Sequence, residues 1–132
     1  ECYFTMHKGD EFIPPHTDAK TKLLSLIFYM PETTFDSSQG GGTNFWKIKE
    51  NFLPWRNWGN KHILDEEQFL KFKEANKVFF ACEYKPNKII GFIKSDVSWH
   101  SVPKINFLEN QRRRAFTINI RLPKTEINKK QL

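Results

Sequence analysis

Hydrophobic positions along this chain fall into short runs that have the length of β-strands and are separated by turn-forming residues. The most apolar run, KLLSLIFYM at 22–30, is typical of a central strand. In the last run, RRAFTINI at 113–120, small or polar side chains largely alternate with apolar ones, as in a strand with two different faces. The pattern predicts eight strands, at 2–7, 11–18, 22–30, 43–47, 78–84, 89–93, 99–102 and 113–122.

Residues 48–77 interrupt the strand pattern. The sequence NFLPWRNWGNKH at 51–62 predicts an irregular aromatic loop, whereas LDEEQFLKFKEA at 64–75 predicts a helix with acidic residues in its first turn. We expect Trp55 and Trp58 in the loop either to cover a substrate or to cap the apolar interior. Eight strands with one or two helices predict an all-β fold with a jelly-roll core, the cupin-like double-stranded β-helix.

The composition is that of a soluble globular protein, with 39% hydrophobic and 27% charged residues among 132, and the length predicts a single domain over 1–132. No apolar run approaches the ~20 residues of a membrane span, so we expect a cytoplasmic protein without membrane contact. The net charge of +6 comes mostly from dispersed residues, which favours a solvated surface over a nucleic-acid interface. The chain begins with Glu1 and shows no signal peptide, so truncation at the N-terminus is an open expectation.

Three residues could together hold a metal ion. His16 and Asp18 occupy positions i and i+2 of a predicted strand, so their side chains would point to the same face. His100 follows 84 residues later in a short strand of its own, and a jelly roll places strands distant in sequence side by side. Two imidazole nitrogens and one carboxylate oxygen are the ligand set of non-haem Fe(II) oxygenases, and zinc accepts the same ligands.

Several stretches, taken in order, resemble the 2-oxoglutarate- and Fe(II)-dependent dioxygenases, in particular the prolyl-4-hydroxylase-like branch. HKGDEFIPPHTDA resembles that branch's entry to its His-x-Asp motif. LLSLIFYMP followed by GGGTNF resembles its next strand, its glycine-rich loop and the strand after it. YKPNKIIGFIKSDVSWHSVPKI resembles the stretch that leads to its distal histidine, and RRRAFTINI resembles its final strand. The resemblance covers nearly the whole chain.

The resemblance implies that His16, Asp18 and His100 hold Fe(II), with 2-oxoglutarate as cosubstrate, O2 as oxidant and ascorbate as a further cofactor. The protein would hydroxylate a small molecule or a protein and release succinate and CO2. An oxygenase that acts on nucleic acid, suggested by the net charge of +6, is one alternative; it is not favoured, because Asn119 stands where nucleic-acid demethylases of this class carry a second arginine. A non-enzymatic jelly-roll module that binds a metal ion or a sugar is the other alternative.

The resemblance also implies a basic residue after the distal histidine that binds the distal carboxylate of 2-oxoglutarate. Three adjacent residues are candidates: Arg112, Arg113 and Arg114. Strand alternation puts Arg113 on the polar face of the last strand, so we expect Arg113 to bind the cosubstrate and the other two to point outward. Its spacing of 13 residues from His100 is longer than usual, which leaves the other two as alternatives. Relatives carry a cosubstrate-binding tyrosine at the position of Met6, so we expect Ser25 to supply that contact.

Overall fold

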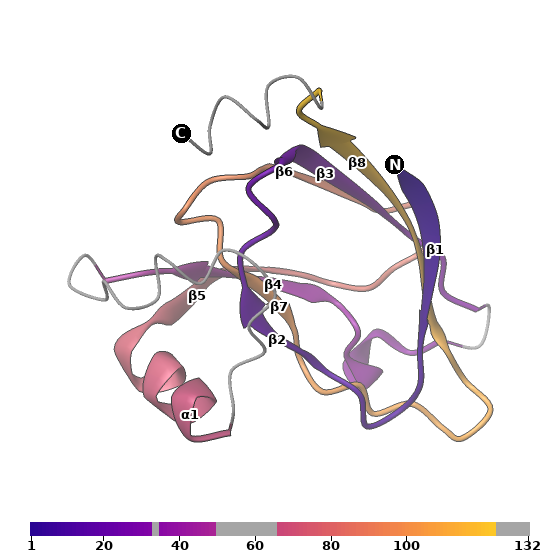
Figure 1. Cartoon of the computed structure of the whole chain (residues 1–132). Coiled ribbons are helices and arrows are strands. Elements are labelled where there is room, and N and C mark those ends of the chain that lie inside the picture. The colour runs from indigo at the N-terminus through magenta and orange to yellow at the C-terminus, as the bar shows by residue number, and fades with distance from the viewer. Residues whose placement is uncertain (33–34, 50–65, 124–132) are drawn as a thin grey trace.

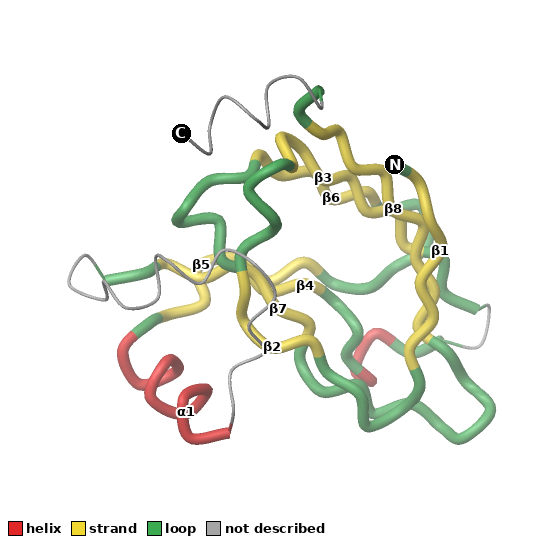
Figure 2. The backbone as a smooth tube through the Cα atoms, in the orientation of Figure 1, coloured by secondary structure: helices red, strands yellow, loops and turns green. Residues whose placement is uncertain are grey.

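The computed structural model describes residues 1–32, 35–49 and 66–123 (Figure 1). Within these ranges the chain is mostly β-structure, with one α-helix and one 3₁₀-helix (Figure 2). The strands are β1 (Cys2–His7), β2 (Ile13–His16), β3 (Lys22–Tyr29), β4 (Thr43–Lys47), β5 (Lys77–Cys82), β6 (Ile89–Ile93), β7 (His100–Val102) and β8 (Arg113–Arg121). The helices are α1 (Glu66–Ala75) and η1 (Ser37–Gln39). No helix in the described ranges is long and apolar enough to cross a membrane.

The strands form two four-stranded sheets in which neighbours in space are distant in sequence. Sheet A has the order β1-β8-β3-β6, and sheet B has the order β2-β7-β4-β5. Every adjacent pair in both sheets is antiparallel. The last strand, β8, therefore lies between β1 and β3, and β7 lies between β2 and β4. This topology confirms the all-β, jelly-roll fold predicted from the sequence.

The second strand is shorter than the predicted strand 11–18. Strand β2 lies at the edge of sheet B, and it contains Pro14 and Pro15, which have no N–H group for the ladder. The pairing with β7 is also irregular between Ile13 and His16. Asp18 consequently lies in the connection to β3 instead of a strand, which corrects the strand geometry expected for His16 and Asp18. The other described strands differ from prediction only near their ends.

The predicted loop between β3 and β4 contains η1 and then the glycines of GGGTNF. Asp36 caps η1, because its Oδ1 accepts a hydrogen bond of 2.9 Å from the Ser38 N–H. Gly41 has a φ of +81°, a conformation that residues with a Cβ rarely adopt. A Cβ at Gly42 would collide with the carbonyl oxygen of Cys82. Glycine thus lets this loop turn tightly and pass close to the end of β5.

The apolar interior has two parts. The first lies between the sheets and includes Tyr29, Phe45 and Tyr84. The second lies where α1 packs on sheet B: Phe72 of α1 is fully buried, and its ring centroid is 5.1 Å from those of both Trp46 and Trp99. Helix α1 therefore covers the outer face of sheet B, on the side opposite sheet A (Figure 1).

The outer face of sheet A is apolar and open to solvent. Alternate residues of its four strands point away from sheet B, and among the described residues no element packs on them. Phe4 of β1 is 70% exposed and Ile93 of β6 is 75% exposed. Further exposed apolar side chains on this face are Met6, Met30, Ile89 and Ile120. The buried polar side chains of the same strands, among them Ser25, Arg113 and Asn119, face inward, toward sheet B.

Candidate metal centre

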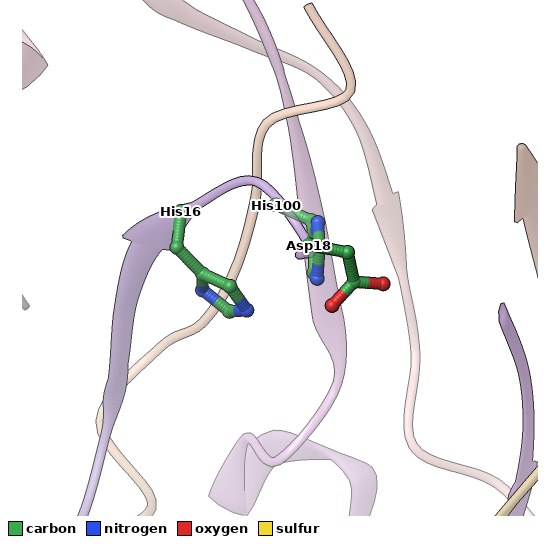
Figure 3. Close-up of side chains that lie close together, drawn as sticks. All are labelled: His16, Asp18 and His100. Atoms are coloured by element: carbon green, nitrogen blue, oxygen red, sulfur yellow. The ribbon is translucent and has the colours of Figure 1, made fainter. Parts of the chain in front are cut away.

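The structure brings His16, Asp18 and His100 together (Figure 3). Each residue offers one nitrogen or oxygen atom, and these atoms lie within 4.8 Å of one another. His16 ends β2 and His100 begins β7, and the two are direct partners in the antiparallel pairing of these strands. Their ring centroids are 4.3 Å apart. Asp18 follows β2 by two residues, so one strand pairing assembles a grouping that spans 84 residues of sequence.

Both histidine rings are oriented by a hydrogen bond to the backbone. Nδ1 of His16 lies 2.8 Å from the carbonyl oxygen of Pro14, and Nδ1 of His100 lies 3.0 Å from that of Ser98. A carbonyl oxygen only accepts, so Nδ1 carries the proton of each neutral ring and Nε2 keeps its lone pair. This is the arrangement of a metal-binding histidine, in which the second nitrogen is fixed by a backbone acceptor.

The three residues have the protonation states that a divalent cation needs. Burial lowers the pKa of His16, and burial together with the nearby His16 ring lowers the pKa of His100 far below 6.5. Burial alone would raise the pKa of Asp18, but hydrogen bonds from Lys22 and Ser25 outweigh this effect and lower it. At neutral pH the grouping therefore contains two neutral imidazoles and one carboxylate, which fits a divalent metal ion such as Fe(II) or zinc.

The carboxylate of Asp18 is held on both sides. Nζ of Lys22 lies 2.8 Å from Oδ1, and Oγ of Ser25 lies 2.6 Å from Oδ2. Asp18 is 8% exposed and Ser25 is 3% exposed, so water screens these contacts little. The grouping itself opens into a cavity of about 130 Å³ between the sheets, lined by inward-facing side chains of both.

Arg113 lies in the same cavity and is only 3% exposed. Its Nε donates a hydrogen bond of 2.6 Å to the carbonyl oxygen of Gly41. Its guanidinium carbon lies 5.5 Å from the ring centroid of Tyr29 and 5.6 Å from that of Tyr84. No carboxylate in the described part of the chain pairs with it. A buried cation without a counter-charge is costly, so this end of the cavity favours an anion.

The neighbouring arginines lie outside the cavity, as strand alternation predicts. Arg112 donates from Nη1 to the backbone carbonyls of Glu109 and Gln111. Arg114 is exposed, and its Nη2 lies 2.7 Å from Oε1 of Glu32. Of the three candidates, only Arg113 can therefore contact a ligand inside the cavity without rearrangement of the strand.

Tyr29 and Thr43 are inward-facing residues that the sequence analysis missed. The Tyr29 hydroxyl lies 2.6 Å from Oγ1 of Thr43, next to Arg113. Burial raises the pKa of Tyr29, so its hydroxyl stays protonated and available as a donor. Alternation along β3 could have identified Tyr29, because it shares a face with Ser25.

The sequence analysis also considered Met6, Ser25 and two loop tryptophans as positions near a bound cosubstrate or substrate. Met6 is 69% exposed on the outer face of sheet A, so the side chain at this position points away from the cavity. Ser25 faces the cavity, but its hydroxyl contacts Asp18 and the side-chain amide of Asn119. Its role in cosubstrate binding stays a prediction. Trp55 and Trp58, with the rest of the predicted loop 51–62, lie outside the described residues.

No protein-family model matches the chain, and no curated protein matches it either. Among solved structures, the fold is similar to that of a prolyl-4-hydroxylase from Pseudomonas putida, with a TM-score of 0.55 and 15% sequence identity. The match covers 91% of this chain and 50% of that one, so this chain spans about half the length of the solved protein. At this identity the likeness is one of fold: the chain has the jelly-roll core that this hydroxylase also has.

Proposed function

We propose that this protein is a 2-oxoglutarate- and Fe(II)-dependent dioxygenase that hydroxylates an organic substrate. One observation carries the proposal: a single cavity contains both the His16, Asp18 and His100 grouping and the buried cation of Arg113, which has no carboxylate partner among the described residues. A module that only binds metal needs the first feature alone. Both features together support a cavity that would hold a metal ion at one end and the distal carboxylate of a dicarboxylic cosubstrate at Arg113.

In this proposal, Nε2 of His16, Nε2 of His100 and a carboxylate oxygen of Asp18 hold the iron. Bound iron would supply the oxidative chemistry of this class, in which O2 and 2-oxoglutarate are converted to succinate and CO2 while the substrate is hydroxylated. Two neutral ligands and one anion leave the site with a net positive charge, which favours the keto-acid end of the cosubstrate.

Arg113 would bind the distal carboxylate of 2-oxoglutarate. The hydrogen bond from Nε to Gly41 fixes the plane of the guanidinium, and the rings of Tyr29 and Tyr84 flank it. The same low exposure that makes a lone cation costly makes an ion pair at this position strong. Apolar side chains such as Phe92 and Ile27 line the cavity and would exclude water from the reacting groups.

We extend the proposal to a small-molecule or protein substrate in preference to nucleic acid. Asn119 is neutral and 2% exposed, so the cavity lacks at this position the second cation of nucleic-acid demethylases. The positive charge of the described surface is also partly neutralised in ion pairs, for example between Arg121 and Glu1.

An anaerobic titration tests the proposal. Fe(II) followed by 2-oxoglutarate should give the visible charge-transfer band of the chelated pair in the parent protein, and His16→Ala should lack this band. Arg113→Met should still bind Fe(II) but need far more 2-oxoglutarate. Admission of O2 should then form succinate. A folded parent protein that binds the metal without ever giving the band would instead support the non-enzymatic metal- or sugar-binding module.

A further inference from the structure

We propose that Ser25 and Asn119 are positioning residues for Asp18, joined to Tyr3 in a directed chain of hydrogen bonds that fixes this carboxylate as a metal ligand. The inference rests on the proposed function only in so far as Asp18 binds a metal ion. It gives Ser25 a task different from the cosubstrate contact expected from the sequence.

The chain of contacts runs through the inner face of sheet A. Ser25 on β3 and Asn119 on β8 are direct cross-strand partners, and both are almost fully buried. Oγ of Ser25 lies 2.6 Å from Oδ2 of Asp18 and 2.9 Å from the side-chain amide of Asn119. The other end of that amide lies 3.2 Å from the hydroxyl of Tyr3 on β1. Three neighbouring strands thus contribute one residue each.

The number of available protons determines which group donates in each of these hydrogen bonds. The Ser25 hydroxyl has one proton, and the charged, closer oxygen of Asp18 can only accept. In the structure Oδ1 of Asn119 faces Oγ of Ser25 and Nδ2 faces the Tyr3 hydroxyl. Because Ser25 must donate its one proton to Asp18, an amide oxygen at Oγ would be left without a proton, so we assign the reverse orientation, with the Asn119 NH2 group toward Oγ. The amide oxygen then faces Tyr3, whose hydroxyl donates to it. In this orientation the oxygen and the nitrogen of the Asn119 amide each have a hydrogen-bond partner.

The position of Asp18 explains why its carboxylate needs hydrogen bonds from a neighbouring strand. Asp18 lies in the connection after β2, so no ladder hydrogen bonds hold it in place. Lys22, four residues later, attracts Oδ1, and among the described residues Ser25 alone donates a hydrogen bond to Oδ2. Because Ser25 belongs to a central strand of sheet A, its hydrogen bond ties a ligand in a loop to a rigid element.

Titration with Co(II), whose visible spectrum reports ligand geometry, tests the proposal without any turnover. Ser25→Ala should bind Co(II) about 10–100-fold more weakly than the parent protein and with an altered spectrum, the usual size of effect for a residue that orients a ligand. Ser25→Thr keeps the hydroxyl and should bind nearly as the parent does. Asn119→Leu, which has a similar size and no charge but cannot donate to Ser25, should also weaken binding.

Thr117→Ala is the matched control. Thr117 is a buried hydroxyl residue on the same face of β8 as Asn119, and it takes no part in the hydrogen bonds that join Tyr3, Asn119, Ser25 and Asp18. The control variant should bind Co(II) as the parent does. Circular dichroism would verify the fold of each variant, and Asn119→Leu serves as the test if Ser25→Ala does not fold. Parental affinity and spectrum in folded Ser25→Ala or Asn119→Leu would overturn the proposal. A parent that binds Co(II) but gives no Fe(II)–2-oxoglutarate band would overturn the dioxygenase function and leave the positioning role standing.

Discussion

Lys22 lies four residues after Asp18 and places its Nζ 2.8 Å from Oδ1 of that carboxylate. Both side chains are shielded from water, with exposed fractions of 12% and 9%. The same carboxylate belongs to the grouping that fits a metal ion. A lysine and a divalent cation would therefore share the negative charge of one aspartate.

Replacing Lys22 by glutamine should tighten the binding of a divalent metal ion. Loss of an ammonium group close to the ligands removes a repulsion on the order of 1 kcal/mol, which corresponds to a dissociation constant about fivefold lower. Equilibrium titration with Co(II) measures this effect. Lys94→Gln is the control, since Lys94 pairs with Asp96 away from the cavity. Weaker binding by the Lys22 variant would mean that the lysine instead holds Asp18 in the right orientation.

Arg113→Met should weaken 2-oxoglutarate binding about 100-fold, because a charged hydrogen-bonded contact of this kind contributes ~3 kcal/mol. Metal affinity should stay at the parental value, and Arg113→Lys should be intermediate, since lysine keeps the charge but not the fork. Arg114→Met, on the opposite face of β8, should leave both affinities unchanged. Equal cosubstrate affinities in the parent and Arg113→Met proteins would exclude the assigned role.

Acid should destabilise the metal-free protein as the pH falls below about 6.5. The pKa values of His16 and His100 are lowered by burial, so below 6.5 the unfolded chain binds protons that the folded protein does not. The free energy of unfolding therefore decreases as the pH falls, by up to ~1.4 kcal/mol per unit for each histidine, and is fully retained above this range. Urea unfolding at pH 7 and pH 5 measures the change. His100→Gln should show a smaller difference between the two, and an equal difference would count against burial as the cause.

Phe72→Ala should destabilise the protein by about 3–5 kcal/mol, because it leaves a cavity between α1 and sheet B. The Phe72 side chain is fully buried between Trp46 and Trp99. Leu70→Ala, two residues away on the same helix, removes a side chain that is 54% exposed and should cost much less. Thermal unfolding of both variants gives the comparison. Similar losses would mean that α1 contributes little to the outer packing of sheet B.

Strand periodicity was sufficient to predict that one face of β8 is buried and the other is turned away from the cavity. Side chains of a strand point alternately to either side, so the sequence alone predicts that Arg113 and Asn119 share a face and that Arg114 lies on the other. The observed burial along β8 follows this alternation. The same reasoning applied to β3 would have added Tyr29 to the candidate cavity residues.

Contacts that depend on strand register could not be predicted in this way. Ser25 meets Asn119 because β3 pairs with β8 in one particular register, which joins residues 94 positions apart. The end of β2 was likewise missed, because two consecutive prolines and an irregular pairing with β7 stop the ladder before Asp18. Pattern analysis identified the metal-ligand candidates, but not the hydrogen bonds that join Asp18 to Ser25 and Ser25 to Asn119.

The open apolar side of sheet A has a practical consequence for work with this protein. Phe4 and Ile93 lie on its two edge strands, and such a surface promotes adsorption and self-association at high concentration. Since their side chains point away from the cavity, Phe4→Lys and Ile93→Lys should raise solubility while Co(II) affinity, measured in parallel, stays at the parental value. One side of the sheet can thus be redesigned for handling while the chemistry on its other side is left as it is.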